Sequence, residues 1–248
     1  MKKYFNIKLE FNHDKLEYAI EKQAKEGKGY CCFVDLNSLV YSSENPDFRN
    51  ILNNSFINSC DGSYIAKQAS KINKEKLEEY IGPDFFKKFI FKEGTHIILG
   101  SKPSVFNKVL EKVNFEGHNI ENIKYLDVPF KSVDKFDYKN IAKTINKIRP
   151  NYIWVCLGAP KQEYFMSKLL PFIDKGLLIG VGAAINYFAG EIKAIPSWIK
   201  KMKIIWVYRA FQEPKKQLTR ILKALTKLRK IIREEKNLHN SVNRKNKF

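Results

Sequence analysis

The feature that most constrains the fold of this chain is the alternation of short apolar runs with longer amphipathic segments. The apolar runs have the length of buried strands, and most of the segments between them carry apolar residues at helical spacing. Strand-like runs cover residues 4–11, 30–36, 95–100, 123–130, 152–158 and 176–184, and helix-like segments cover residues 14–29, 63–72, 101–113, 138–150 and 159–170. This order predicts an α/β fold with a doubly wound, mostly parallel sheet over residues 1–195, which binds ligands at the carboxyl ends of its strands.

The C-terminal fifth of the chain is strongly basic. Residues 196–248 carry 16 Lys and Arg against 3 Glu, a net +13 out of +19 for the whole chain. Apolar residues recur there at helical spacing, and Lys and Arg fill the rest of the helix surface. The apolar stripe consists of Leu218, Ile221, Leu222, Leu225, Leu228, Ile231, Ile232 and Leu238. We expect a basic, amphipathic helical appendage over residues 196–238 and a disordered tail over residues 239–248.

Composition disfavours several classes of protein. No run reaches the roughly 18 apolar residues of a transmembrane helix, and the N-terminus lacks the apolar block of a signal peptide. We therefore expect a cytoplasmic protein. The cysteines Cys31, Cys32, Cys60 and Cys156 form no C-x-x-C pair, and buried thiols are expected. No Cys/His cluster has zinc spacing, so no metal site is predicted.

The pair Asp61-Gly62, between an apolar approach and a helix-like segment, allows two interpretations. Asp-Gly is a common turn pair and Asp is a preferred N-cap residue, so Asp61 could simply cap the helix. Alternatively, Asp61 is a lone carboxylate at the mouth of a pocket and is available as a base. The residues by themselves favour the capping role.

Three further strand-to-helix turns carry residues suited to ligand binding. They are Gly100 and Ser101, then Lys161, Gln162 and Glu163, and finally Gly182 and Asn186. The first pair precedes a helix whose N–H groups could hold a phosphate. The second group is predicted to project from a first helical turn at the mouth of the site. The last pair joins a glycine that admits a ligand close to the backbone with an amide suited to a base or sugar. Each turn could equally be an ordinary strand–helix corner.

Motifs in the second half of the chain carry a resemblance to a known family. Gly-x-Pro-Lys-Gln-Glu, Gly-Val-Gly-Ala and Tyr-Arg-x-x-x-Glu-Pro follow one another between Cys156 and Leu222. In this combination the chain resembles the WecG/TagA/CpsF family, glycosyltransferase family 26, over nearly its whole length. The N-terminal half matches more loosely, through Asn37 and Asp61-Gly62.

The resemblance implies a hexosyltransferase that is inverting and metal-independent, and that moves a sugar from a UDP-sugar to a lipid-diphosphate-linked acceptor. Well-known members add N-acetylmannosamine, or its uronic acid, to N-acetylglucosamine-diphospho-undecaprenol in the synthesis of teichoic acid and other surface polysaccharides. They have a Rossmann-like core and an appendage that meets the membrane, a GT-E-like arrangement. The implied partners are a UDP-sugar, the lipid-linked acceptor and the anionic inner face of the cell membrane, without nucleic acid or a cofactor; a homo-oligomer stays open.

The resemblance also implies roles for single residues. Asp61 matches the family's proposed catalytic base, which reverses the preference for a capping role. Arg209, Lys216 and Arg220 in the appendage are suited to stabilise the leaving UDP or to hold the acceptor diphosphate. The remaining matched positions are expected to contact substrate. They are Asn37, Gly100, Ser101, Lys161, Gln162, Glu163, Gly182 and Asn186.

The chain departs from the family pattern at two positions. Glu79 stands where members often have Arg, three residues before the glycine that matches Gly82, and Asn186 stands where Asp is usual. The donor sugar and the acceptor therefore stay open. So do two other classes: a nucleic-acid-binding protein that uses the basic helix, and a non-catalytic family member. The continuous Leu/Ile stripe favours an interfacial helix over a nucleic-acid arm.

Overall fold

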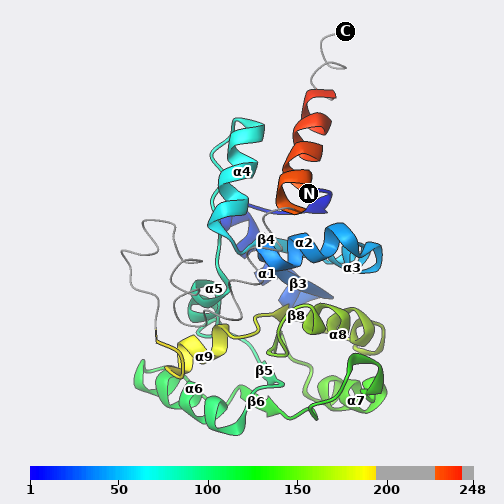
Figure 1. Cartoon of the computed structure of the whole chain (residues 1–248). Helices are drawn as coiled ribbons and strands as arrows, with labels where there is room; N and C mark the ends of the chain where they lie inside the picture. The colour runs from blue at the N-terminus through cyan, green and yellow to red at the C-terminus, as the bar shows by residue number, and fades with distance from the viewer. Residues whose placement is uncertain (194–226, 242–248) are drawn as a thin grey trace.

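The computed structural model describes residues 1–193 and 227–241, and its centre is a six-stranded sheet whose neighbouring strands are all parallel (Figure 1). In spatial order the strands are β4 (Ile57–Cys60), β3 (Lys28–Val34), β8 (Gly176–Gly180), β7 (Tyr152–Val155), β5 (His96–Leu99) and β6 (Ile123–Leu126). The chain fills one edge with β3 and β4, crosses to β5 and β6, and then returns to the middle with β7 and β8. This confirms the predicted α/β fold with a Rossmann-like parallel sheet.

Helices cover both faces of the sheet because side chains alternate along each strand and so feed two separate cores. In β3, Cys31 and Phe33 enter one core and Cys32 and Val34 enter the other. The first core is covered by α1 (His13–Glu26), α5 (Gly82–Phe89), α6 (Pro103–Phe115) and α9 (Ala184–Ala189). The second is covered by α2 (Leu36–Glu44), α3 (Pro46–Asn54), α4 (Ser63–Asn73), α7 (Tyr138–Ile148) and α8 (Lys161–Leu169).

The prediction of a single strand at the N-terminus is wrong. Residues 4–11 were expected to form a single strand, but the chain forms a small antiparallel hairpin of β1 (Lys3–Tyr4) and β2 (Ile7–Lys8). Phe5 and Asn6 make its turn with φ values of 53° and 63°, in the left-handed region. The runs at residues 123–130, 152–158 and 176–184 also give shorter strands than expected, because the last residues of each run belong to the connection that follows the strand.

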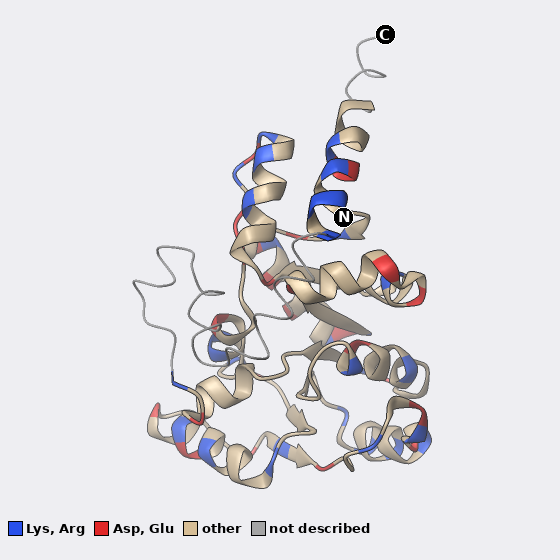
Figure 2. Cartoon of the chain, viewed as in Figure 1, with Lys and Arg blue, Asp and Glu red and all other residues tan. Residues whose placement is uncertain are grey.

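The helix at residues 227–241 packs on the core. Leu228 and Ile231 from the apolar stripe are 3% and 6% exposed and join the same core as the hairpin. Glu235 accepts a buried hydrogen bond of 2.8 Å from the Phe5 N–H, and Lys227 pairs with Glu44 of α2. Leu228 and Ile231 are therefore covered by protein, whereas Leu238, the last residue of the stripe, is 49% exposed. Lys and Arg side chains also face solvent on this helix (Figure 2).

The structure also bears on the expected disordered tail, on membrane spans and on the cysteines. The helix continues through residues 239–241, which were expected to be disordered. None of the helices that the structure describes is long and apolar enough to cross a membrane. Cys31, Cys32 and Cys60 are buried free thiols, as predicted, while Cys156 is half-buried beside the site.

Candidate active site

Asp61 directly follows β4 at the carboxyl edge of the sheet. Its N–H donates to the Val34 carbonyl of β3 at 2.9 Å, which continues the parallel ladder by one residue. The N-cap of α4 is Gly62, and no side chain caps that helix end. The simpler interpretation, in which Asp61 caps the helix, is therefore wrong.

The carboxylate of Asp61 lies where α5 and α9 meet the end of β4. A side-chain carbon on Gly82, the first residue of α5, would lie 3.7 Å from Asp61 Oδ2 and 3.8 Å from the Ala184 Cβ of α9. Because Gly82 has no side chain, the first turn of α5 comes close to this carboxylate, and a larger residue there would be in van der Waals contact with it. The geometry fits a carboxylate that can meet a substrate group at the strand ends, as expected of a base.

A cleft of about 390 Å³ lies on the other side of α9, between that helix and the first turn of α6. It is lined by Gly100, Ser101, Lys102, Ser104, Val105, Cys156, Ile185, Asn186, Glu191 and Ile192. Three predicted ligand residues, Gly100, Ser101 and Asn186, thus share one cleft. The Tyr125 hydroxyl donates to the Ser101 carbonyl at 2.6 Å and fixes the turn that opens the cleft.

The first turn of α8 differs from the prediction. Lys161, Gln162 and Glu163 were expected to project together, yet consecutive helical residues point about 100° apart, and only Lys161 reaches the surface. Its ammonium lies 4.6 Å from the ring centroid of Phe130 and 5.3 Å from that of Phe136, both on the loop after β6. Gln162 and Glu163 are 4% and 1% exposed, so direct contact with a ligand is not available to them in this conformation.

The buried Gln162 side chain contacts the loop after β7 and lies close to the loop after β8. Its Oε1 accepts the Gly158 N–H at 3.1 Å, and its Nε2 donates to Glu163 Oε1 at 3.0 Å. The same Oε1 would lie 3.3 Å from a side-chain carbon on Gly182, whose φ of 49° already disfavours other residues. Burial, reinforced by the charge of Asp35, raises the pKa of the Glu163 carboxyl to about 7.

Neither Asn37 nor Glu79 lines the cleft. Asn37 is exposed on the first turn of α2, where its amide donates to Asp35 Oδ2 at 3.3 Å. Glu79 precedes Tyr80, and its carbonyl lies 3.1 Å from His13 Nε2. Arg209, Lys216 and Arg220 lie outside the described residues.

Sequence reasoning missed two residues at the site. Asp35 follows β3 as Asp61 follows β4, and the register Val34↔Cys60 sets these two acidic residues at neighbouring strand ends. Asp35 is the N-cap residue of α2, and its Oδ1 accepts the Ser38 N–H at 2.8 Å. The sequence pattern Asp35-x-x-Ser38 could have indicated this cap. Phe130 is fully exposed beside Lys161, and no sequence signal indicated a surface role, because Phe130 ends the apolar run at residues 123–130 that was expected to form a strand.

The fold and this edge define a Rossmann-like α/β protein with a ligand cleft where parallel sheets bind ligands. A profile described as "Glycosyl transferase WecG/TagA/CpsF family" matches residues 4–241. The chain belongs to this family of glycosyl transferases, as the sequence motifs indicated.

Two curated relatives match most of the chain. Both are named N-acetylglucosaminyldiphosphoundecaprenol N-acetyl-beta-D-mannosaminyltransferase. The protein from Bacillus subtilis (strain 168) is 28% identical over 198 residues, which cover 77% of this chain and 74% of the relative. The protein from Bacillus spizizenii (strain ATCC 23059 / NRRL B-14472 / W23) is 25% identical over 175 residues, which cover 69% of this chain and 66% of the relative.

Proposed function

We propose that this chain is an inverting glycosyltransferase that moves a hexose from a UDP-sugar to a sugar linked through diphosphate to a polyprenol. N-acetylmannosamine is the first candidate for the transferred sugar. The printed names of both Bacillus relatives support this, since they pair an N-acetylmannosaminyl group with N-acetylglucosaminyldiphosphoundecaprenol. The product would enter the synthesis of teichoic acid or another cell-surface polysaccharide.

The observation that carries the proposal is the position of Asp61, directly after β4 at the carboxyl edge of the parallel sheet. An acceptor hydroxyl is a poor nucleophile at neutral pH, and a carboxylate at the strand ends can take its proton as the oxygen attacks the anomeric carbon. The new glycosidic bond forms on one face of the sugar while the bond to UDP breaks on the other. A single displacement of this kind inverts the anomeric centre.

The cleft beside α6 suits the nucleotide part of the donor. Its volume of about 390 Å³ lies within the usual range of roughly 300–1,000 Å³ for ligand sites. Lys102 and Ser104 line it at the helix N-terminus, where N–H groups and a positive charge can stabilise phosphate in the role a metal ion would otherwise have. Asn186 on the opposite wall offers an amide to the base or sugar. Arg209, Lys216 and Arg220 remain candidates for holding the diphosphates.

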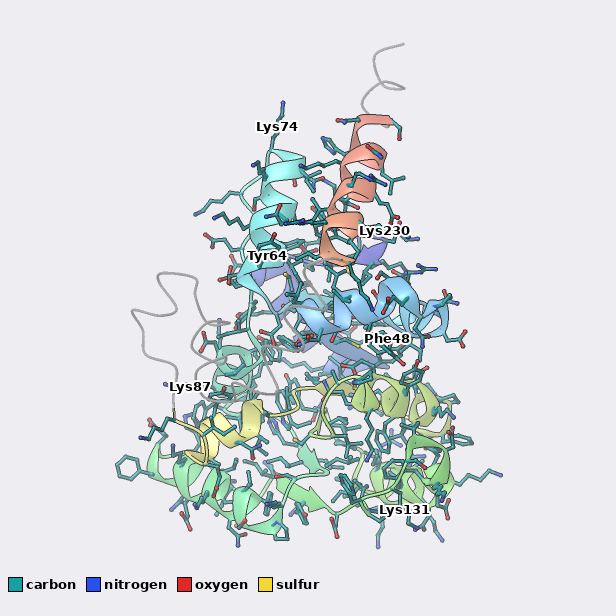
Figure 3. All side chains as sticks on the ribbon, viewed as in Figure 1. Phe48, Tyr64, Lys74, Lys87, Lys131 and Lys230 are labelled. Carbon is teal, nitrogen blue, oxygen red and sulfur yellow. The ribbon has the colours of Figure 1, made fainter. Side chains whose placement is uncertain are left out.

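A basic face beside Asp61 supports action at an anionic membrane surface. Tyr64, Lys67 and Lys71 are exposed on α4 at spacings of three and four residues, so they share one face, and the exposed Lys74 directly follows the helix. Figure 3 shows Lys74 pointing away from the tip of α4. The helix at residues 227–241 adds Arg229, Arg233 and Lys236, and it projects from the same end of the molecule (Figure 1). Leu228 and Ile231 of the apolar stripe are covered, so the proposed attraction is mainly electrostatic, with Leu238 left 49% exposed at the end of the stripe.

The test is a screen of UDP-sugars with a short-chain lipid-diphospho-N-acetylglucosamine acceptor, in EDTA, read by mass spectrometry and by NMR of the new linkage. Asp61→Asn should lower kcat by about 10²–10⁴ while UDP affinity stays within about twofold. Asp174→Asn, an exposed position just before β8 at the opposite edge of the sheet, is the matched control. Near wild-type kcat in a folded Asp61→Asn protein would refute the base. Activity that EDTA abolishes and Mg²⁺ or Mn²⁺ restores would refute metal independence.

A further inference from the structure

Glu163 is a buried carboxyl that the proposed reaction does not use. It is 1% exposed, and its Oε2 atom has no hydrogen-bond partner in the described part of the chain. A substrate cannot reach it in this conformation, so the expected role as a ligand contact does not fit. A buried polar atom without a partner is costly, and an ionised one far more so. The contact that the Glu163 carboxyl does make, through Oε1, is therefore the place to look for its role.

The atom that Glu163 does contact is the amide nitrogen of Gln162. With Glu163 Oε1 accepting from Nε2, the amide can turn in one direction only, with its oxygen toward the Gly158 N–H. That oxygen lies between two loops, because a side-chain carbon on Gly182 would lie 3.3 Å from it and 3.5 Å from the Gly158 Cα. One amide, whose orientation depends on Glu163, therefore accepts a hydrogen bond from the loop after β7 and packs against the loop after β8.

We propose that Glu163 is a positioning residue, which in its neutral form holds the Gln162 amide and, through it, the two loops that border the donor site. This inference rests on the proposed function for its effect on donor binding. A neutral carboxyl still accepts from Gln162 through Oε1. An ionised one would leave a charged, unpartnered Oε2 in the core, and it would set a negative charge under a site meant for a diphosphate.

The electrostatic surroundings favour the neutral form. In the described ranges, Asp35 at the end of β3 and the Cys32 thiol within β3 are the ionisable groups whose charges couple to Glu163. The other charges near α8 are engaged elsewhere, since Asp47 of α3 acts on Tyr164 and Asp134 pairs with Lys168. The Lys161 ammonium, in the first turn of α8, lies over the rings of Phe130 and Phe136. No cation among these groups offsets the burial of Glu163. The pKa of about 7 is consistent with a carboxyl that is largely neutral in mildly acidic solution.

The sign of the pH dependence follows directly. The folded-state pKa lies above the unfolded value of 4.5, so the folded protein binds more protons, and stability is lost as pH rises from 4.5 through 7. Glu163→Gln keeps an acceptor for Gln162 and cannot ionise. Its Tm relative to wild type should therefore rise by about 5 °C or more between pH 5 and pH 8.5. Glu111→Gln on the exposed side of α6 is the control and should show no such trend.

The functional arm uses UDP as the probe, with calorimetry at pH 6.5 and pH 8.5. UDP affinity of the wild type should fall about tenfold over this range, while that of Glu163→Gln should stay within about twofold. Glu163→Leu, which removes the acceptor, should bind UDP about tenfold more weakly at pH 6.5, and Glu163→Gln should not. A Tm difference that is constant with pH, or a folded Glu163→Gln protein with tenfold weaker UDP binding at pH 6.5, would overturn the proposal. Absence of UDP binding in every protein, with the Tm trend intact, would overturn the proposed donor and still support the neutral carboxyl.

Discussion

Removing the Glu235 carboxylate tests how the C-terminal helix is held on the core. Glu235 is 8% exposed, and its Oε2 accepts the Phe5 N–H at 2.8 Å. Phe5 is itself 5% exposed in a left-handed turn, so Glu235→Ala leaves a buried N–H without this acceptor. Burial raises the pKa of Glu235, and the hydrogen bond from Phe5 opposes that shift. The pair thus fastens residues 227–241 to the N-terminal hairpin.

The magnitude follows from the orphaned donor. A hydrogen bond to a charged acceptor contributes about 1.5–3 kcal/mol, and leaving a buried N–H unpaired costs a similar amount. If the helix opens locally, that free energy appears in the exchange of protected amides with solvent, where 1.4 kcal/mol corresponds to about tenfold. We therefore expect the protection of the Phe5 amide to fall by about 10- to 100-fold in Glu235→Ala.

The assay is amide hydrogen exchange, followed by NMR or by mass spectrometry of the N-terminal peptide, with thermal unfolding in parallel. Glu234→Ala is a matched control, since Glu234 is the exposed neighbour in the same helix and its closest partner is Lys230 at 4.0 Å. Glu235→Gln keeps a neutral acceptor and should retain part of the protection. Equal protection of the Phe5 amide in wild type and Glu235→Ala would refute the reasoning.

Two further predictions concern His96 and α4. His96 Nδ1 accepts from Trp154 Nε1, and burial lowers its pKa from 6.5 to about 4, so the folded state binds fewer protons and stability falls as pH drops from 6.5 to 4. In urea titrations, the free energy of unfolding of the wild type should fall by about 2 kcal/mol more than that of His96→Gln between pH 7 and pH 5. An equal fall in both proteins would contradict this. Changing Lys67, Lys71 and Lys74 to Glu should weaken binding to anionic vesicles by about 100-fold or more at low salt, while the same change at Lys139, Lys143 and Lys147 of α7 should have a small effect; equal losses would contradict a docking face.

The strands of the sheet were predictable because buried parallel strands are continuous apolar runs. Residues 152–155, Tyr-Ile-Trp-Val, are all apolar or aromatic and are buried on both faces of the sheet, as expected of a central parallel strand. The N-terminal hairpin was not predictable in the same way, because the apolar alternation runs on through Phe5 and Asn6. A left-handed Phe is rare, and here the docked Glu235 helps to hold it. The cause lies 230 residues away in the sequence.

The candidate site was predictable in position and only partly in orientation. The motifs identified the correct strand ends, so Gly100, Ser101 and Asn186 do meet in one cleft. Those motifs did not indicate which face of α8 packs on the sheet. In the structure Gln162 and Glu163 point inward while Lys161 stays near the surface. Which face of a short helix packs on the sheet depends on its neighbours as well as on its own residues.

The arrangement of the site constrains where transfer would take place. Asp61 and the cleft lie on opposite sides of the first turn of α9, since Ala184 is near the Asp61 carboxylate while Ile185 and Asn186 line the cleft. A donor with its nucleotide in the cleft must therefore extend its sugar across the start of α9 to reach an acceptor hydroxyl beside Asp61. The exposed residue at that crossing is Ala183, directly after Gly182, and its side chain is small. Gly182 in turn packs on Gln162, so the Glu163–Gln162 pair supports the surface over which the sugar would pass.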